Sequence, residues 1–120
     1  MAGYVDGFVV PVPKKNLAAY KRMAQWGKRT WLKHGALQYF ECAGQDLKVK
    51  KGCGLSYPKG LRLKPGETVV FAFITYRSKA HRDAVNKKVM GDPSMGQAPP
   101  EMPFDINRMM WGGFRVMVEG

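Results

Sequence analysis

TVVFAFITY, residues 68–76, is a nearly continuous apolar run built mostly from β-branched and aromatic side chains. Such a run predicts a central β-strand covered on both faces, because a strand with one solvated face alternates apolar and polar residues. Apolar side chains occupy both faces of this strand: Val69, Phe71 and Phe73 on one, and Val70, Ala72, Ile74 and Tyr76 on the other. The sheet around this strand therefore needs cover on two sides.

The clearest helical period in the chain lies upstream, over residues 14–34. Basic doublets occupy one arc of this segment, and Gly35 supplies a C-terminal stop. The opposite stripe recurs at steps of three and four and consists of Leu17, Tyr20, Ala24, Gly27, Trp31 and His34. This pattern predicts an amphipathic helix with one face against the sheet.

Four further elements complete the order. Strands are predicted over 4–11, where prolines end the run, over 36–43 and over 108–118, and Ser78 caps a second helix that ends at Asp92-Pro93. Long connections are predicted over the basic segment 47–66, which closes with the turn signature KPGE, and over 91–107. The order strand, helix, strand, strand, helix, strand predicts an α+β, ferredoxin-like βαββαβ sandwich that occupies residues 1–120 as one domain.

The number of layers then predicts the assembly. Two helices cover only one face of a four-stranded sheet, and monomers rarely expose a large contiguous apolar surface. A second copy of the chain is the simplest cover, so we expect a homodimer with its sheets face to face.

Composition limits location and cofactors. No stretch approaches the roughly 20 apolar residues that cross a bilayer, and no signal-peptide pattern precedes the first strand, so we expect a cytoplasmic protein without a membrane partner. Cys42, expected to be buried in its strand, and Cys53, in the basic connection, are too few for a disulfide framework or a metal knuckle. We expect neither a metal nor a cofactor.

Carboxylates inside apolar strands are the first site candidates. Asp6 and Glu41 each interrupt such a strand, and burial in a dimer cavity would raise their pKa values and suit them to proton transfer. His34 ends the helical stripe and is a third acid–base candidate, although packing at a helix end explains it as well. For the carboxylates the structural alternative is an edge position or a hydrogen bond, for instance to Arg108 or Arg115.

Three residues are candidates for ligand binding. Tyr39 and Trp111 offer aromatic walls, and Arg115 offers an anion contact. Trp111 is equally typical of a core or dimer contact.

Several segments resemble one bacterial family. The segments are 4–13 (YVDGFVVPVP), 34–37 (HGAL) with Glu41-Cys42, 64–70 (KPGETVV), 80–86 (AHRDAVN), 102–105 (MPFD), and Arg108-Met109 with 111–114 (WGGF). Together they resemble the YbaA-like proteins, domain of unknown function 1428. The resemblance implies a dimeric α/β-barrel built from ferredoxin-like halves, and it implies no activity.

Three functions stay open at this level. The first is binding or conversion of a small anionic or aromatic molecule in the cavity between the two sheets, with enzyme activity undecided. The second is nucleic-acid binding, particularly of RNA, which the net charge of +11 and the basic connection favour. The third is a structural or partner-binding role without catalysis.

Overall fold

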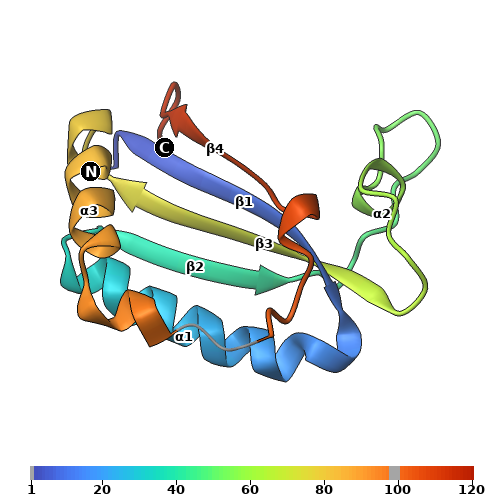
Figure 1. Cartoon of the computed structure of the whole chain (residues 1–120). Coiled ribbons are helices and arrows are strands. Elements are labelled where there is room, and N and C mark those ends of the chain that lie inside the picture. Colours follow the sequence, from blue (N-terminus) through green and yellow to red (C-terminus); the bar gives the residue numbers. More distant parts are fainter. Residues whose placement is uncertain (1, 98–100) are drawn as a thin grey trace.

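The computed structural model describes residues 2–97 and 101–120 (Figure 1). Its elements, in chain order, are β1 (Tyr4–Pro13), η1 (Lys14–Asn16), α1 (Leu17–Lys33), β2 (Gln38–Ala43), α2 (Tyr57–Gly60), β3 (Glu67–Tyr76), α3 (Lys79–Met90), η2 (Pro93–Gln97), η3 (Ile106–Arg108) and β4 (Met110–Arg115). The strands form one antiparallel sheet in the order β2-β3-β1-β4. The α+β prediction is confirmed, and this strand order is compatible with a ferredoxin-like fold.

Two boundaries differ from the prediction for local reasons. The first helix begins at Leu17 rather than at residue 14, because residues 14–16 form a 3-10 turn; Gly35, with φ of 109°, ends it as predicted. Strand β1 continues through Pro13 instead of stopping at Pro11. Its pairing with β4 ends at Val9, so no strand lies beside Pro11 and Pro13 on that side. The missing N–H groups of the two prolines therefore cost no hydrogen bond between strands.

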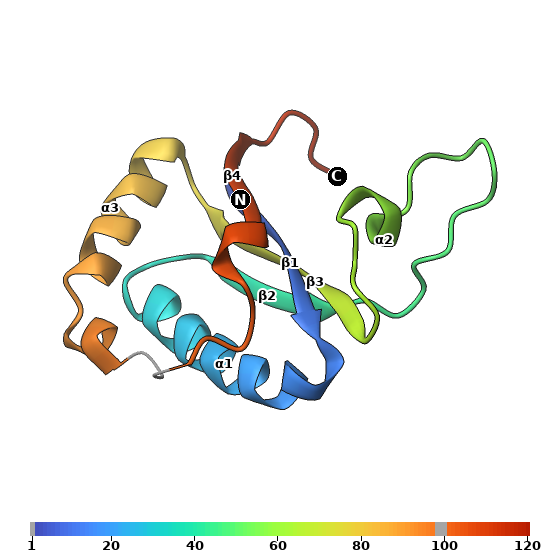
Figure 2. The ribbon, with the colours of Figure 1, turned by 45° about the vertical axis from the view of Figure 1, so that its right-hand side comes forward.

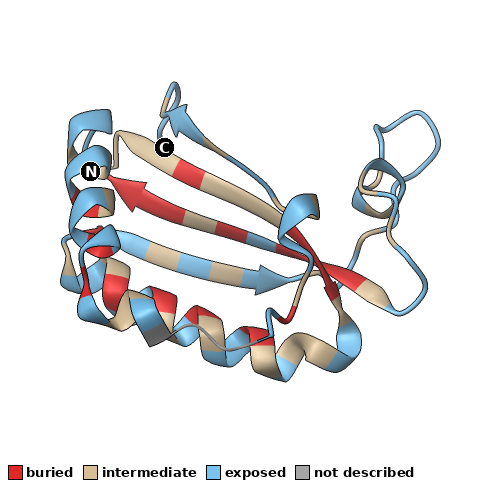
Figure 3. Cartoon of the chain, viewed as in Figure 1, coloured by how far each residue is buried: buried red, intermediate tan, exposed pale blue. Residues whose placement is uncertain are grey.

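The helices cover one side of the sheet. Buried positions concentrate on β1, β3 and the inner faces of α1 and α3 (Figure 3). One core cluster joins β1, α1 and β3 and contains Val10, Val12, Tyr20, Ala24 and Val70. A second cluster joins β3 to α3 and contains Ala36, Ile74, Tyr76, Val85 and Val89.

The other side of the sheet, here called the open face, is not covered by α1 or α3, although Pro11, Val69 and Thr75 on it are buried. Four of its side chains are about half exposed: Phe40 (45%), Phe71 (44%), Met110 (59%) and Phe114 (60%). Its members in the strands are Val5, Gly7, Val9, Pro11, Pro13, Gln38, Phe40, Cys42, Glu67, Val69, Phe71, Phe73, Thr75, Met110, Gly112 and Phe114, and Glu67, at the start of β3, is the one charged residue among them. The predicted second face without cover is therefore present. Cys42 lies on it and is exposed, so the prediction of a buried Cys42 was wrong.

Residues 44–66, here called the arm, leave the sheet on the side opposite to α1 and α3 (Figure 2). The C-terminal residues after β4 project on this side as well. The arm contains the short helix α2, which was not predicted, and it ends in the predicted turn. There the Glu67 N–H donates to the Lys64 carbonyl (3.0 Å), and Gly66 has φ of 82°.

Among the residues that the structure describes, every helix is too short or too polar to cross a membrane.

Candidate functional site

Five of the six predicted site residues lie in strands on the helix-facing side of the sheet. Strand register places Glu41 beside Ala72, Ala72 beside Phe8, and Phe8 beside Trp111, so these four form one row across the sheet. The same register places Tyr39 and Asp6 on either side of Ile74, and Arg115 opposite Tyr4. A chamber between two open faces would therefore not contain these side chains.

Glu41 forms the most compact polar group on this side of the sheet. The Tyr20 hydroxyl donates to its Oε1 (2.6 Å), and the Tyr39 hydroxyl donates to its Oε2 (2.7 Å). Both distances fall in the range of charge-assisted O–H···O⁻ bonds. Within residues 2–97 and 101–120, no basic side chain forms a salt bridge with this carboxylate. Two phenols therefore replace the cation that usually balances a carboxylate.

The two tyrosines are strong donors to Glu41 and poor acids. Burial raises the pKa of Tyr20 and of Tyr39 well above the usual value, and the negative charge of Glu41 raises both further. Both hydroxyls therefore keep their protons at every physiological pH. Glu41 is the member of the group that can accept a proton.

Gly27 makes room for this group. It lies in the middle of α1, where glycine costs about 1 kcal/mol relative to alanine. A Cβ at this position would lie 2.5 Å from the Tyr39 hydroxyl and 3.3 Å from its Cζ. The missing side chain thus lets the Tyr39 hydroxyl reach Glu41 beneath the helix.

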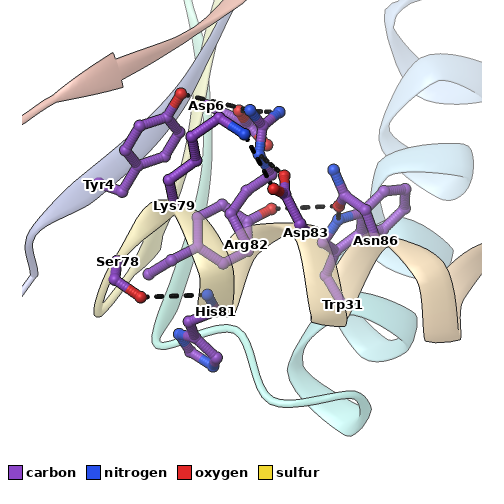
Figure 4. Close-up of polar contacts among 10 residues, drawn as sticks. Tyr4, Asp6, Trp31, Ser78, Lys79, His81, Arg82, Asp83 and Asn86 are labelled. Atoms are coloured by element: carbon purple, nitrogen blue, oxygen red, sulfur yellow. Dashed lines mark hydrogen bonds and ion pairs between the residues drawn. The ribbon is translucent and has the colours of Figure 1, made fainter.

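Asp6 lies in a second polar group, between β1 and α3 (Figure 4). It is 2% exposed, and Arg82 Nη1 donates to its Oδ1 (3.2 Å) while Arg82 Nη2 donates to the Tyr4 hydroxyl (3.2 Å). Arg82 faces the sheet because it shares a side of α3 with the buried Val85 and Val89. The structural alternative for Asp6 is thus realised, with Arg82 as the partner instead of Arg108 or Arg115.

Burial and the arginine act on Asp6 in opposite directions. Burial raises the pKa of Asp6, and the positive charge of Arg82 offsets only part of that rise. Arg82 also pairs with the exposed Asp83 (3.0 Å), so its charge is shared between two carboxylates. Asp6 is therefore a buried carboxylate that is incompletely compensated.

His34 lies apart from both carboxylate groups, at the end of α1. Its Nε2 lies 2.7 Å from Asp92 Oδ2, and the Ser94 hydroxyl and N–H donate to Asp92 Oδ1 (2.7 and 2.9 Å). The Ser94 amide, followed by His34, holds the pKa of Asp92 well below its usual value. This group connects α1 to the segment after α3, which favours the packing interpretation of His34.

Trp111 is the exposed aromatic residue of the helix-facing row. Its ring stacks on Phe8, with centroids 5.9 Å apart and an angle of 16° between the planes, and the residue is 57% exposed. Arg115 is exposed on the same face of β4. Both predicted ligand contacts are therefore available to solvent.

Sequence reasoning missed three partners in these groups. Tyr20 was assigned to the helical stripe, and Arg82 and Asp92 were not singled out. The interruption of an apolar strand by a carboxylate points to an unknown partner, but spacing along the chain does not identify it. Arg108, suggested as such a partner, instead binds Glu67 (2.6 Å).

In the described part of the chain, no three His, Cys, Asp or Glu side chains come together in a group that could hold a metal ion.

Comparison with known proteins assigns the family. The family model described as protein of unknown function (DUF1428) matches residues 3–106. The chain belongs to this family. DUF1428 relatives described as "Uncharacterized protein YbaA" occur in Escherichia coli (strain K12) and Shigella flexneri, and each is 40% identical over 116 residues, or 97% of this chain and 97% of the relative. The resemblance in sequence is confirmed, and the names of this family and of these relatives assign no activity.

Proposed function

We propose that the chain acts as a homodimer that binds or converts a small anionic or aromatic molecule on the helix-facing side of each sheet. The observation that carries this proposal is the pairing of Glu41 with two tyrosine hydroxyls, at 2.6 and 2.7 Å, where a cation would be expected. A mid-helix glycine that weakens α1 makes this pairing possible. Proteins accept such local costs more often at functional sites than elsewhere.

The chemistry of this site is proton exchange. Glu41 accepts a proton from a ligand, and the two tyrosine hydroxyls that donate to the carboxylate hold it in place. Trp111, stacked on Phe8 in the same row, supplies an aromatic surface, and Arg115 supplies a positive charge at the edge of the sheet. These features suit an aromatic carboxylate or a similar small anion.

The open face supports the proposed dimer. Its four most exposed side chains present about 400 Å² of apolar surface, taking about 200 Å² for a fully exposed aromatic side chain. A stable interface buries about 800 Å² on each partner. The arm and the C-terminal residues, including Met117 and Val118 (each 85% exposed), extend on the same side and supply further surface.

The ligand proposal is tested with 4-hydroxybenzoate as the probe, in isothermal titrations between pH 5 and 8. Glu41→Gln keeps the shape of the site and removes its base, so we expect at least a tenfold loss of affinity and loss of proton exchange with the buffer. Glu119→Gln, at an exposed position, is the matched control. Equal affinity and equal proton exchange in wild type and Glu41→Gln would refute the role of Glu41.

The dimer is tested separately, by sedimentation at micromolar concentration. Wild type should sediment as two 13.5 kDa chains. Phe71→Lys places a charge in the open face and should give a single chain, whereas Ala18→Lys, at an exposed position of α1, should leave the dimer intact. A wild type that sediments as one chain excludes the homodimer.

A further inference from the structure

A large basic cavity lies between the arm and the start of β3. Its volume is about 1230 Å³, which exceeds the 300–1,000 Å³ usual for drug-sized ligands. Its lining includes six lysines, of which Lys14 precedes α1 and five belong to the arm: Lys48, Lys50, Lys51, Lys59 and Lys64. Glu67 is the only carboxylate among the lining residues.

The charge of that single carboxylate is already neutralised. Arg108 Nη1 donates to Glu67 Oε2 (2.6 Å), and the Lys64 N–H donates to Oε1 (2.7 Å). The hydrogen bond from Arg108 lowers the pKa of Glu67, which keeps it ionised and paired. The lysines around the cavity therefore repel one another without an internal counter-charge.

The arm that carries most of these lysines has a defined shape. The Cys53 N–H donates to the Lys50 carbonyl (3.0 Å), and Ser56 caps α2 by accepting from the Lys59 N–H. Arg108 Nη2 donates to the carbonyls of Leu61 (3.4 Å) and Arg62 (3.1 Å), so one arginine holds the arm and neutralises Glu67. The backbone that carries these lysines is thus held in place before any ligand binds.

We propose that this cavity binds a chain of phosphates, such as the phosphodiester backbone of single-stranded RNA or inorganic polyphosphate. All six lysines are exposed, and the lining contains no arginine that would grip one phosphate with two donors. Separate ammonium groups spread over a long cavity match a ligand whose charges are also spread out. The site is distinct from the Glu41 group and does not require it.

A polyanion could bind to any basic surface of the protein, so the cavity must be compared with a second basic surface of the same chain. The outer face of α1 carries Lys21, Arg22, Lys28 and Arg29, all exposed, and none of them lines this cavity. If net charge alone attracts the polyanion, loss of charge from α1 and from the arm should weaken binding equally. If the cavity is the site, only the arm should matter.

The experiment measures fluorescence anisotropy of a labelled 12-nucleotide oligouridylate at 50 and 200 mM salt. With six lysines in contact, a slope of about −0.7 per phosphate contact predicts that affinity falls about 300-fold over this range. The double variant Lys50→Glu/Lys51→Glu should lose at least tenfold in affinity and have a shallower slope. The control Lys21→Glu/Lys28→Glu, with the same change in charge, should bind nearly as wild type does.

Competition with polyphosphate of about twelve units distinguishes the two sources. Equal competition would assign recognition to the phosphates alone, and tighter binding of RNA would add contacts to bases. Arg108→Ala, which releases both Glu67 and the arm, should also weaken binding. The proposal is overturned if wild type does not bind at 50 mM salt or if the α1 control loses as much affinity as the arm variant. Sedimentation of the same variants keeps this result separate from the dimer.

Discussion

Replacement of Gly27 by alanine should destabilise the protein, although alanine is the better helix former. The substitution gains about 1 kcal/mol of helix propensity. The new Cβ would lie 2.5 Å from the Tyr39 hydroxyl, so this hydroxyl must move away from Glu41. A hydrogen bond to a charged group contributes about 1.5–3 kcal/mol. The net effect of Gly27→Ala is therefore a loss of about 0.5–2 kcal/mol in the free energy of unfolding.

The same substitution should have the opposite sign once the Tyr39 hydroxyl is gone. In a Tyr39→Phe background the clash is removed and the bond to Glu41 is already absent. Gly27→Ala should then stabilise the chain, by up to about 1 kcal/mol. The two substitutions should thus be coupled by about 1.5–3 kcal/mol, far above the 0.3–0.5 kcal/mol scatter of independent sites.

Urea unfolding of the four proteins, at one fixed concentration, measures this coupling. The fixed concentration matters because dissociation of the proposed homodimer would contribute to the apparent stability. If Gly27→Ala stabilises wild type and Tyr39→Phe by the same amount, then the Tyr39 hydroxyl does not depend on the missing side chain at Gly27. The link between α1 and the Glu41 group would then be refuted.

Three further predictions follow from the other groups. The ionised form of Asp92, whose pKa is lowered by Ser94 and His34, stabilises the fold above pH about 4. Unfolding midpoints should therefore fall more steeply between pH 5 and 3 in wild type than in Asp92→Asn, and parallel profiles would contradict this. Arg82→Ala leaves the buried Asp6 unpaired and should cost about 3–5 kcal/mol in urea unfolding, part of which Asp6→Asn should restore if the lost pairing is the cause. Thiol labelling of Cys42, on the open face, should slow as protein concentration rises, while labelling of Cys53 in the arm should not, and equal rates at all concentrations would argue against an interface there.

Much of the fold follows from local patterns in the sequence. The apolar run over residues 68–76 predicts β3, and the stripe of the first helix predicts which side of α1 is buried. The shortage of cover predicts the open face. These features depend on neighbours along the chain or on the number of layers, which the sequence shows directly. The end of β1 was misjudged because the proline rule depends on where the neighbouring strand stops.

The candidate site was less predictable. A carboxylate within an apolar strand indicates that a partner exists, so Asp6 and Glu41 could be found. Their partners Arg82 and Tyr20 come from helices, and the sequence shows neither how a helix crosses the sheet nor which side chain reaches which strand. The sequence also did not show on which face of the sheet Asp6 and Glu41 lie. Alternation along a strand separates two faces, but it does not tell which face the helices cover.

The open face carries one charged strand residue, Glu67, and Arg108 already neutralises it; this lack of free charge, next to so basic an arm, has a consequence for the response to ionic strength. Two copies of a chain with net charge +11 repel one another, and the carboxylate of Glu67 on the open face is already paired with Arg108, so it does little to offset this repulsion. Added salt screens the repulsion and should tighten the pairing of the two copies. The same salt should weaken the proposed binding of a phosphate chain by the lysines. Two events on one side of the molecule should therefore respond to salt in opposite directions.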